Sequence, residues 1–420
     1  MFSAILIVLV VWTSRCQQIP YHVYYCVHPF CSGVEKNVTD AIIQHAAPGM
    51  AFAAINSTSG APLLIASAGR FTYEDWDAIV TRETSFDMAS CSKVMGTTTA
   101  TAMLYQQGYL GLDDYVSSSN LLGAGFASQG KGNITIRNLL LHNAGFPPDP
   151  SPGYSSHSFG CPETAQYHPG QQYSCDKMIL DNLLYNQTIV TPPGEKFVYS
   201  DLSMITLMFV VGRVVQRHAL VASMVAPCLD SENIVCQFHA FVLSNIFQPL
   251  SMDNTSYVPT NAEYCVPQWN DPVYRHSFVK GFVSDENSYA LGGIAGHAGV
   301  FTNVMDAVKL MKVWMWATEP KMLNETTIKL FITVANLTQS SRALGWDTNN
   351  QAYRWCGTFS NETFLHIGFT GTELCGDPVT GVTTVMLANG RYPDYTQDGM
   401  IWYRPAFNQL IHDLYVTGNV

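Results

Sequence analysis

Short apolar runs near both ends of the chain predict strands. Residues 50–55 and 63–68 are two such runs, and the polar stretch Asn56-Ser57-Thr58-Ser59-Gly60 between them is typical of a turn. Three further strands are expected near the other end, separated by turns with Gly and Pro, at 364–367, 373–376 and 383–388.

Between these runs, longer apolar stretches with helical spacing fill the middle of the chain. The expected helices lie at 38–45, 92–107, 134–142, 202–217, 236–247 and 406–416. Strands at both ends most simply pair into one antiparallel sheet, with the helical middle inserted as a second lobe. We therefore expect an α+β fold whose domain covers 38–418. The sheet lobe comes from 38–85 and 290–418, and the all-helical lobe from 90–289.

The first residues predict entry into the secretory pathway. Residues 4–12 form an unbroken apolar run that is too short to span a bilayer and fits the core of a signal peptide at 1–16. Residues 17–37 then form an N-terminal extension. The apolar stretch at 204–211 is short and ends in Gly212 and Arg213, so it predicts a buried helix and no membrane anchor.

The composition indicates a compact globular protein. The chain has 420 residues, of which 47% are hydrophobic and 13% charged, a balance typical of a compact protein with a large core. The net charge is −11 and no basic run interrupts it, so neither nucleic acid nor an anionic membrane surface is an expected partner.

Two residue patterns agree with a secreted protein. Eight Asn-x-Ser/Thr acceptors predict N-glycosylation, at Asn37, Asn56, Asn133, Asn186, Asn254, Asn324, Asn336 and Asn361. The 11 cysteines include closely spaced pairs that favour disulfides over a metal site: Cys26 with Cys31, Cys161 with Cys175, Cys228 with Cys236, and Cys356 with Cys375. Cys265 has no such neighbour.

The first candidate catalytic motif is Ser90-Cys91-Ser92-Lys93. A three-residue step at the start of a helix puts Ser90 and Lys93 on one face, where the ammonium can stabilise the serine alkoxide. Tyr199, in Tyr199-Ser200-Asp201, can serve as general base and then as general acid. His366-Ile367-Gly368-Phe369 lies on an expected strand, where its glycine lets backbone N–H groups approach a substrate carbonyl.

With these three elements, the chain resembles the serine beta-lactamase and penicillin-binding protein superfamily, and most closely its class C-like, esterase-like branch. The resemblance runs from about 38 to 415, and its other motifs occur in the same order. They are Phe86-Asp87-Met88-Ala89-Ser90, Leu140-Leu141-His142-Asn143-Ala144-Gly145, Leu291-Gly292-Gly293-Ile294-Ala295-Gly296-His297-Ala298-Gly299 and Gly345-Trp346-Asp347-Thr348.

The resemblance implies a beta-lactamase/transpeptidase-like fold and a role for each site residue. Ser90 would be the acylated nucleophile, Lys93 its activating partner and Tyr199 the proton shuttle. The backbone N–H groups of Ser90 and Phe369 would form the oxyanion hole, and Asp201, His366 and Gly368 would face the substrate. No metal or organic cofactor is implied.

Two positions depart from the family pattern. Asp201 stands where Asn is usual, and its carboxylate either holds the Lys93 ammonium or hinders Tyr199. His366 replaces a permanent cation with a titratable group, and it is either a substrate contact or a packed, neutral strand residue. Both departures argue against efficient beta-lactam hydrolysis. His297 is expected to brace a tight loop.

The sequence therefore predicts a secreted serine hydrolase that cleaves an ester or an amide through an acyl-enzyme. Small esters, D-amino-acid peptides, beta-lactam-like compounds and bacterial wall fragments are the candidate substrates. Two alternatives stay open: a catalytically silent extracellular binding protein that keeps the fold, and a transferase that passes its acyl group to an amine.

Overall fold

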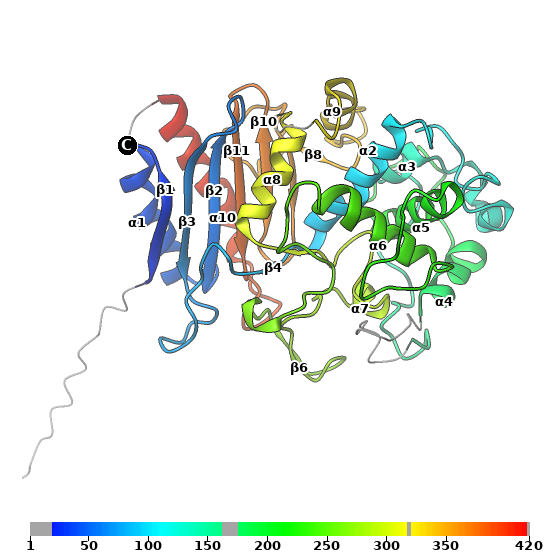
Figure 1. Cartoon of the computed structure of the whole chain (residues 1–420), viewed down its shortest axis with the longest axis horizontal. Coiled ribbons are helices and arrows are strands. Elements are labelled where there is room, and N and C mark those ends of the chain that lie inside the picture. The colour runs from blue at the N-terminus through cyan, green and yellow to red at the C-terminus, as the bar shows by residue number, and fades with distance from the viewer. Residues whose placement is uncertain (1–18, 162–174, 317–320, 418–420) are drawn as a thin grey trace, which may run out of the picture.

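A seven-stranded antiparallel sheet forms one side of the molecule (Figure 1). The computed structural model describes residues 19–161, 175–316 and 321–417. The strand order in the sheet is β1-β3-β2-β11-β10-β9-β8. These strands are β1 (Tyr21–Cys26), β2 (Gly49–Asn56), β3 (Pro62–Gly69), β8 (Asp347–Thr348), β9 (Phe364–Ile367), β10 (Glu373–Asp377) and β11 (Val382–Ala388).

Helices cover both faces of this sheet. On one face α1 (Phe30–Ile43) and α10 (Gly399–His412) share a core with it, and α8 (Val304–Trp314) packs on the other (Figure 1). The interior strand β2 is therefore buried on both sides, which explains why its sequence is a continuous apolar run and not an alternating one.

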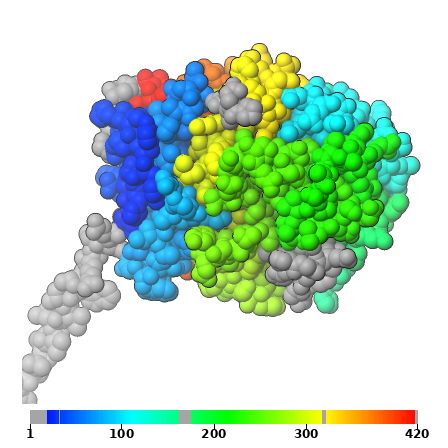
Figure 2. All heavy atoms as spheres, in the orientation of Figure 1, coloured from blue at the N-terminus to red at the C-terminus, as the bar shows by residue number. Residues whose placement is uncertain are grey.

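The remaining helices lie together beside the sheet (Figure 1), and one of them, at 325–332, comes from the segment 290–418 that was expected in the sheet lobe. They are α2 (Thr99–Gln106), α3 (Ile136–Leu140), α4 (Asp176–Asp181), α5 (Asp201–His218), α6 (Ile234–Val242), α7 (Glu286–Ala290) and α9 (Glu325–Ile332). Helix α5 is buried along most of its length, and α6 packs against it. Two small strand pairs complete the fold: β4 (Phe86–Asp87) with β7 (Phe301–Thr302), and β5 (Asn270–Asp271) with β6 (Ser277–Phe278). The middle of the chain, green in Figure 2, packs directly against the later segment drawn in yellow.

The start of the domain differs from the expectation. Within the expected N-terminal extension, residues 19–37 belong to the folded domain, because β1 pairs with β3 at the edge of the sheet and α1 begins at Phe30, eight residues before the expected helix at 38. The aromatic side chains of this segment suit a half-exposed edge strand. Helices α8 and α9 were not predicted, although Asn303 and Asn324 cap their first turns.

Four disulfides join the cysteine pairs named from the sequence: Cys26–Cys31, Cys161–Cys175, Cys228–Cys236 and Cys356–Cys375. Cys265 is free and buried. The signal segment 1–16 lies outside the described residues, as does 162–174. In the part of the chain that the structure describes, no helix has the length and apolar character needed to cross a bilayer.

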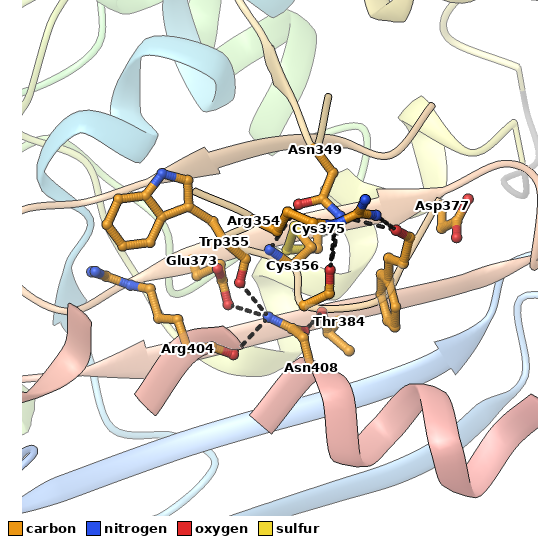
Figure 3. Close-up of a disulfide and its surroundings, with 12 residues drawn as sticks. Asn349, Arg354, Trp355, Cys356, Glu373, Cys375, Asp377, Thr384, Arg404 and Asn408 are labelled. Carbon is orange, nitrogen blue, oxygen red and sulfur yellow. Dashed lines mark hydrogen bonds between the residues drawn. A yellow bond between two sulfur atoms is a disulfide. The ribbon is translucent and has the colours of Figure 1, made fainter. Parts of the chain in front are cut away.

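A carboxyl group is buried beside the Cys356–Cys375 disulfide, between the sheet and α10 (Figure 3). Glu373 is 1% exposed, and its Oε2 accepts a hydrogen bond from Asn408 Nδ2 at 2.7 Å. Burial raises the pKa of Glu373 to about 7, against the opposing effects of the Arg404 cation and the Asn408 hydrogen bond.

This raised pKa predicts a pH-dependent stability. Below the ordinary glutamate pKa both states bind the proton. As the pH rises from there to about 7, the unfolded chain ionises before the folded protein does, and stability falls. We expect the Glu373→Gln variant to gain about 3 kcal/mol of unfolding free energy relative to wild type between pH 4 and pH 8. Denaturant titrations of both proteins at several pH values measure this difference, and a difference that does not change with pH would contradict it.

Candidate active site

The nucleophile candidate Ser90 lies where the sheet meets the helical lobe. It occupies a short 3₁₀ turn, η1 (Ala89–Cys91), between β4 and the π-helical turn η2 (Lys93–Thr98) that leads into α2. Ala89, just before it, has φ of 45°, a conformation that costs an L-residue about 1–2 kcal/mol. Strained backbone of this kind is frequent at functional sites, and here it sets the turn that carries Ser90.

Hydrogen bonds tie the segment before Ser90 to the loop that follows β9. Thr370 Oγ1 donates to the Asp87 carbonyl (2.7 Å), and Thr372 Oγ1 donates to the Met88 carbonyl (3.0 Å). Ser90 and the strand expected to bind substrate are therefore held in one rigid unit.

Lys93 is fully buried and directed at Ser90. Its Nζ donates to Ser90 Oγ and to the His297 carbonyl, both at 2.9 Å, and lies 2.7 Å from Asp201 Oδ1 in an ion pair. Burial lowers the pKa of Lys93, but the charge of Asp201, aided by Tyr199, outweighs it and leaves this pKa raised. Lys93 is therefore protonated at neutral pH, and its ammonium is hydrogen-bonded to Ser90 Oγ.

Asp201 begins α5, and its carboxylate contacts Lys93. Of the two possibilities that the sequence left open, the structure has the first: this carboxylate is the counter-charge of the lysine. Its side chain is 16% exposed, so it borders the site without being sealed from it.

Tyr199 precedes α5 and lies between two cations. Lys93 Nζ is 5.0 Å from the centroid of its ring, and the Arg342 guanidinium is also 5.0 Å away. The His142 ring packs against Tyr199 with the centroids 4.8 Å apart. The structure thus brings Ser90, Lys93 and Tyr199 together around one ammonium group.

His366 is buried in β9, and its Nδ1 contacts the Ile367 carbonyl at 3.0 Å. Burial, followed by the positive charges of Arg342 and Lys93, lowers the pKa of His366 well below its usual value. This histidine is neutral at physiological pH, which agrees with a packed strand residue and not with a titratable cation.

Arg342 is a permanent cation close to Tyr199 and His366, and it was not among the residues predicted for the site. It is 8% exposed, and its Nη2 lies 3.2 Å from Asp347 Oδ2. The residue stands three positions before the motif Gly345-Trp346-Asp347-Thr348. Its proximity to a family motif was the only available indication, because the contact with Tyr199 joins residues far apart in sequence.

The proposed oxyanion hole has two unused donors. Within the described residues, the backbone N–H groups of Ser90 and Phe369 donate to no protein acceptor. Gly368 lies against the nucleophile segment, since a Cβ there would come 2.5 Å from the Met88 carbonyl oxygen. The Phe369 side chain is 49% exposed, which puts this part of the site at the molecular surface.

His297 contacts both Lys93 and Asp285 at the site. Its carbonyl accepts from Lys93, and its Nε2 lies 2.8 Å from Asp285 Oδ1. Burial lowers the pKa of His297, but Asp285 overcomes this effect and raises it. Asp201, Asp285 and His297 lie close enough together to share an ion, yet the Lys93 ammonium already neutralises Asp201. The positive charge among these donors disfavours a metal cation.

Comparisons with known proteins agree with this geometry. The beta-lactamase family model matches residues 34–404. A protein of Escherichia coli (strain K12) named putative D-alanyl-D-alanine carboxypeptidase is 29% identical over 336 residues, which cover 74% of this chain and 70% of that protein. A protein of the same name from Salmonella typhimurium is 29% identical over 342 residues, with the same coverage.

Solved structures share the fold. The structure of EstCE1, described as a hydrolase with promiscuous acyltransferase activity, matches with a TM-score of 0.64 and 20% identity, over 89% of this chain and 98% of that one. A penicillin-binding protein homologue from Caulobacter crescentus matches with a TM-score of 0.65 and 16% identity. The match covers 94% of this chain and 98% of that one. Because the family model spans most of the chain, this protein belongs to the beta-lactamase family and is a serine hydrolase.

Proposed function

We propose that this protein is secreted and cleaves an ester or amide bond through an acyl-enzyme on Ser90. The observation that carries the proposal is the 2.9 Å hydrogen bond from the Lys93 ammonium to Ser90 Oγ, beside two backbone N–H groups that have no protein acceptor. A buried cation on a serine oxygen stabilises its alkoxide, and free N–H groups stabilise an oxyanion.

The reaction follows from these positions. Ser90 Oγ attacks the carbonyl carbon while Tyr199, reacting as the phenolate beside the Lys93 ammonium, accepts the serine proton and becomes the neutral phenol. The oxyanion accepts hydrogen bonds from the N–H groups of Ser90 and Phe369. When the carbon–leaving-group bond breaks, Tyr199 returns the proton to the leaving group. Water then attacks the acyl-enzyme by the same path and releases the acid.

The substrate class we favour is a D-amino-acid peptide with a free carboxylate. Arg342 gives the site a positive charge that does not titrate, and the Escherichia coli relative carries the name of a D-alanyl peptide carboxypeptidase. A neutral small ester is the second candidate, since the fold of EstCE1 also carries hydrolase activity. Secretion is supported by the apolar run at 4–12 and by four disulfides.

A fluorophosphonate probe tests the nucleophile directly. We expect an adduct on Ser90, located by mass spectrometry of the labelled peptide, and no adduct in Ser90→Ala. If the folded protein takes up no probe, the hydrolase proposal fails and a silent binding protein becomes the better interpretation.

Substrate choice is then tested with matched peptides. Peptides ending in D-alanyl-D-alanine and the same peptides with an amidated C-terminus differ only in the carboxylate. Faster release of D-alanine from the free acid than of D-alaninamide from the amidated peptide supports the role of Arg342, and equal rates contradict it. Added amine distinguishes acyl transfer from hydrolysis by the product formed.

A further inference from the structure

Arg404, on α10, reaches the peptide group that forms half of the proposed oxyanion hole. Its guanidinium is buried, with the residue 4% exposed, and its Nη2 donates to the Gly368 carbonyl at 2.6 Å and to the Thr372 carbonyl at 3.2 Å. Figure 3 shows Arg404 beside Glu373, on the side of the sheet that α10 covers. Arg404 therefore contacts this peptide group from the α10 side of the sheet, and not from the side of the substrate.

The Gly368 carbonyl and the Phe369 N–H belong to the same peptide group. A cation that binds the carbonyl oxygen draws electron density from the amide, and the N–H at the other end becomes a stronger donor. The effect is large in a buried position, where charges are poorly screened. The Phe369 N–H donates to no protein acceptor among the described residues, so its donor strength is available to a ligand.

We propose that Arg404 is a positioning residue that fixes and polarises the Gly368–Phe369 peptide group, and so strengthens the oxyanion hole. This inference rests on the proposed hydrolase function.

The surroundings of Arg404 keep its charge in place. Glu373 provides a buried carboxyl near it, and Asn408 links the two by donating to Glu373 Oε2 (2.7 Å) and to the Arg404 carbonyl (3.1 Å). The Trp355 ring lies 5.7 Å from the guanidinium carbon. Two carbonyl acceptors on Nη2 and the nearby Trp355 ring hold the guanidinium in place.

Arg391 provides a matched control next to the same loop. Its Nε donates to the Phe369 carbonyl at 2.9 Å, and its guanidinium lies 3.9 Å from the Phe369 ring centroid. It therefore binds the next peptide group, whose N–H belongs to Thr370 and is not part of the proposed hole. Arg391 follows β11 and contacts this loop from outside it, so its loss removes a nearby cation but leaves the Gly368–Phe369 peptide group bonded to Arg404.

The test is infrared spectroscopy of the acyl-enzyme formed with p-nitrophenyl acetate that carries ¹³C at its carbonyl. A stronger oxyanion hole lowers the stretching frequency of the bound ester carbonyl. We expect this band to move to higher wavenumber in Arg404→Met and by less in Arg404→Lys, and to stay in place in Arg391→Met. We also expect kcat of Arg404→Met to fall about tenfold with little change in KM. This decrease in kcat is smaller than the decrease of about a hundredfold or more that follows removal of a whole oxyanion-hole donor.

A double variant distinguishes a loss of oxyanion-hole strength from a loss of folded structure. Arg404→Met removes the cation that opposes the raised pKa of Glu373, so Arg404→Met with Glu373→Gln removes the guanidinium, keeps the shape of the acid and leaves no titratable group at position 373. If this variant unfolds cooperatively, is acylated, and keeps the wild-type band and kcat, the role of Arg404 is refuted. If wild-type Ser90 itself takes no acyl group, the hydrolase proposal fails and this role fails with it.

Discussion

Replacement of Lys93 by methionine is expected to lower the rate of Ser90 acylation by about a thousandfold, because a positioned activating group typically contributes an acceleration of about this size. Methionine fills a similar volume but has no charge, so Ser90 Oγ loses the ammonium 2.9 Å away that stabilises its alkoxide. Stopped-flow measurement of the fluorophosphonate reaction, or of p-nitrophenol release, gives the rate.

The same change is expected to destabilise the fold, because it leaves Asp201 as an unpaired charge beside a fully buried side chain. Loss of one partner of a buried ion pair typically costs about 3–5 kcal/mol. The variant Lys93→Met with Asp201→Asn removes both charges, so we expect it to recover most of the stability and none of the activity. Recovery of activity together with stability would show that Lys93 acts only as a structural residue.

Replacement of Gly368 by alanine is expected to lower kcat by about a hundredfold, comparable to the loss of one oxyanion-hole donor. A Cβ at this position would lie 2.5 Å from the Met88 carbonyl oxygen and 2.1 Å from Thr372 Oγ1. Backbone atoms cannot yield as a flexible side chain does, so the strand and the nucleophile turn must move apart. That movement separates the N–H groups of Phe369 and Ser90.

Gly132→Ala is the matched control for this prediction. The nearest atom to a Cβ there lies 3.5 Å away, an ordinary contact, so the same chemical change is made without a clash. Steady-state kinetics and thermal unfolding of both variants separate the two effects. Wild-type turnover by a folded Gly368→Ala protein would mean that the Phe369 N–H does not take part in the reaction.

Local sequence patterns predicted the parts of the fold that depend on local structure. The apolar runs that became β2, β3, β9, β10 and β11 were recognisable because each is long enough and is bounded by turn residues. The edge strand β1 was missed because it is half-exposed and has no clear alternation. Helix α8 was missed although Asn303 and Asp306 form a recognisable cap.

The candidate site was predicted where its residues lie in motifs and missed where a contact joins distant segments. Ser90, Lys93 and Tyr199 were named from short patterns. The pairing of Asp201 with Lys93 was only one of two possibilities, because it depends on how α5 packs against the nucleophile turn. Arg342 and Arg404 act through contacts with Tyr199 and with the Gly368 carbonyl, which no spacing in the sequence encodes.

The strand order also determines when this protein can complete its fold. β2 ends at Asn56, and it is bonded on one side to β11, which begins at Val382. The disulfides span only 5 to 19 residues, so none of them joins these two parts of the chain. During synthesis this edge of β2 therefore has no partner until residues 382–388 have been made. A nascent chain with such an unpaired strand edge is prone to associate with other strands until β11 has been made.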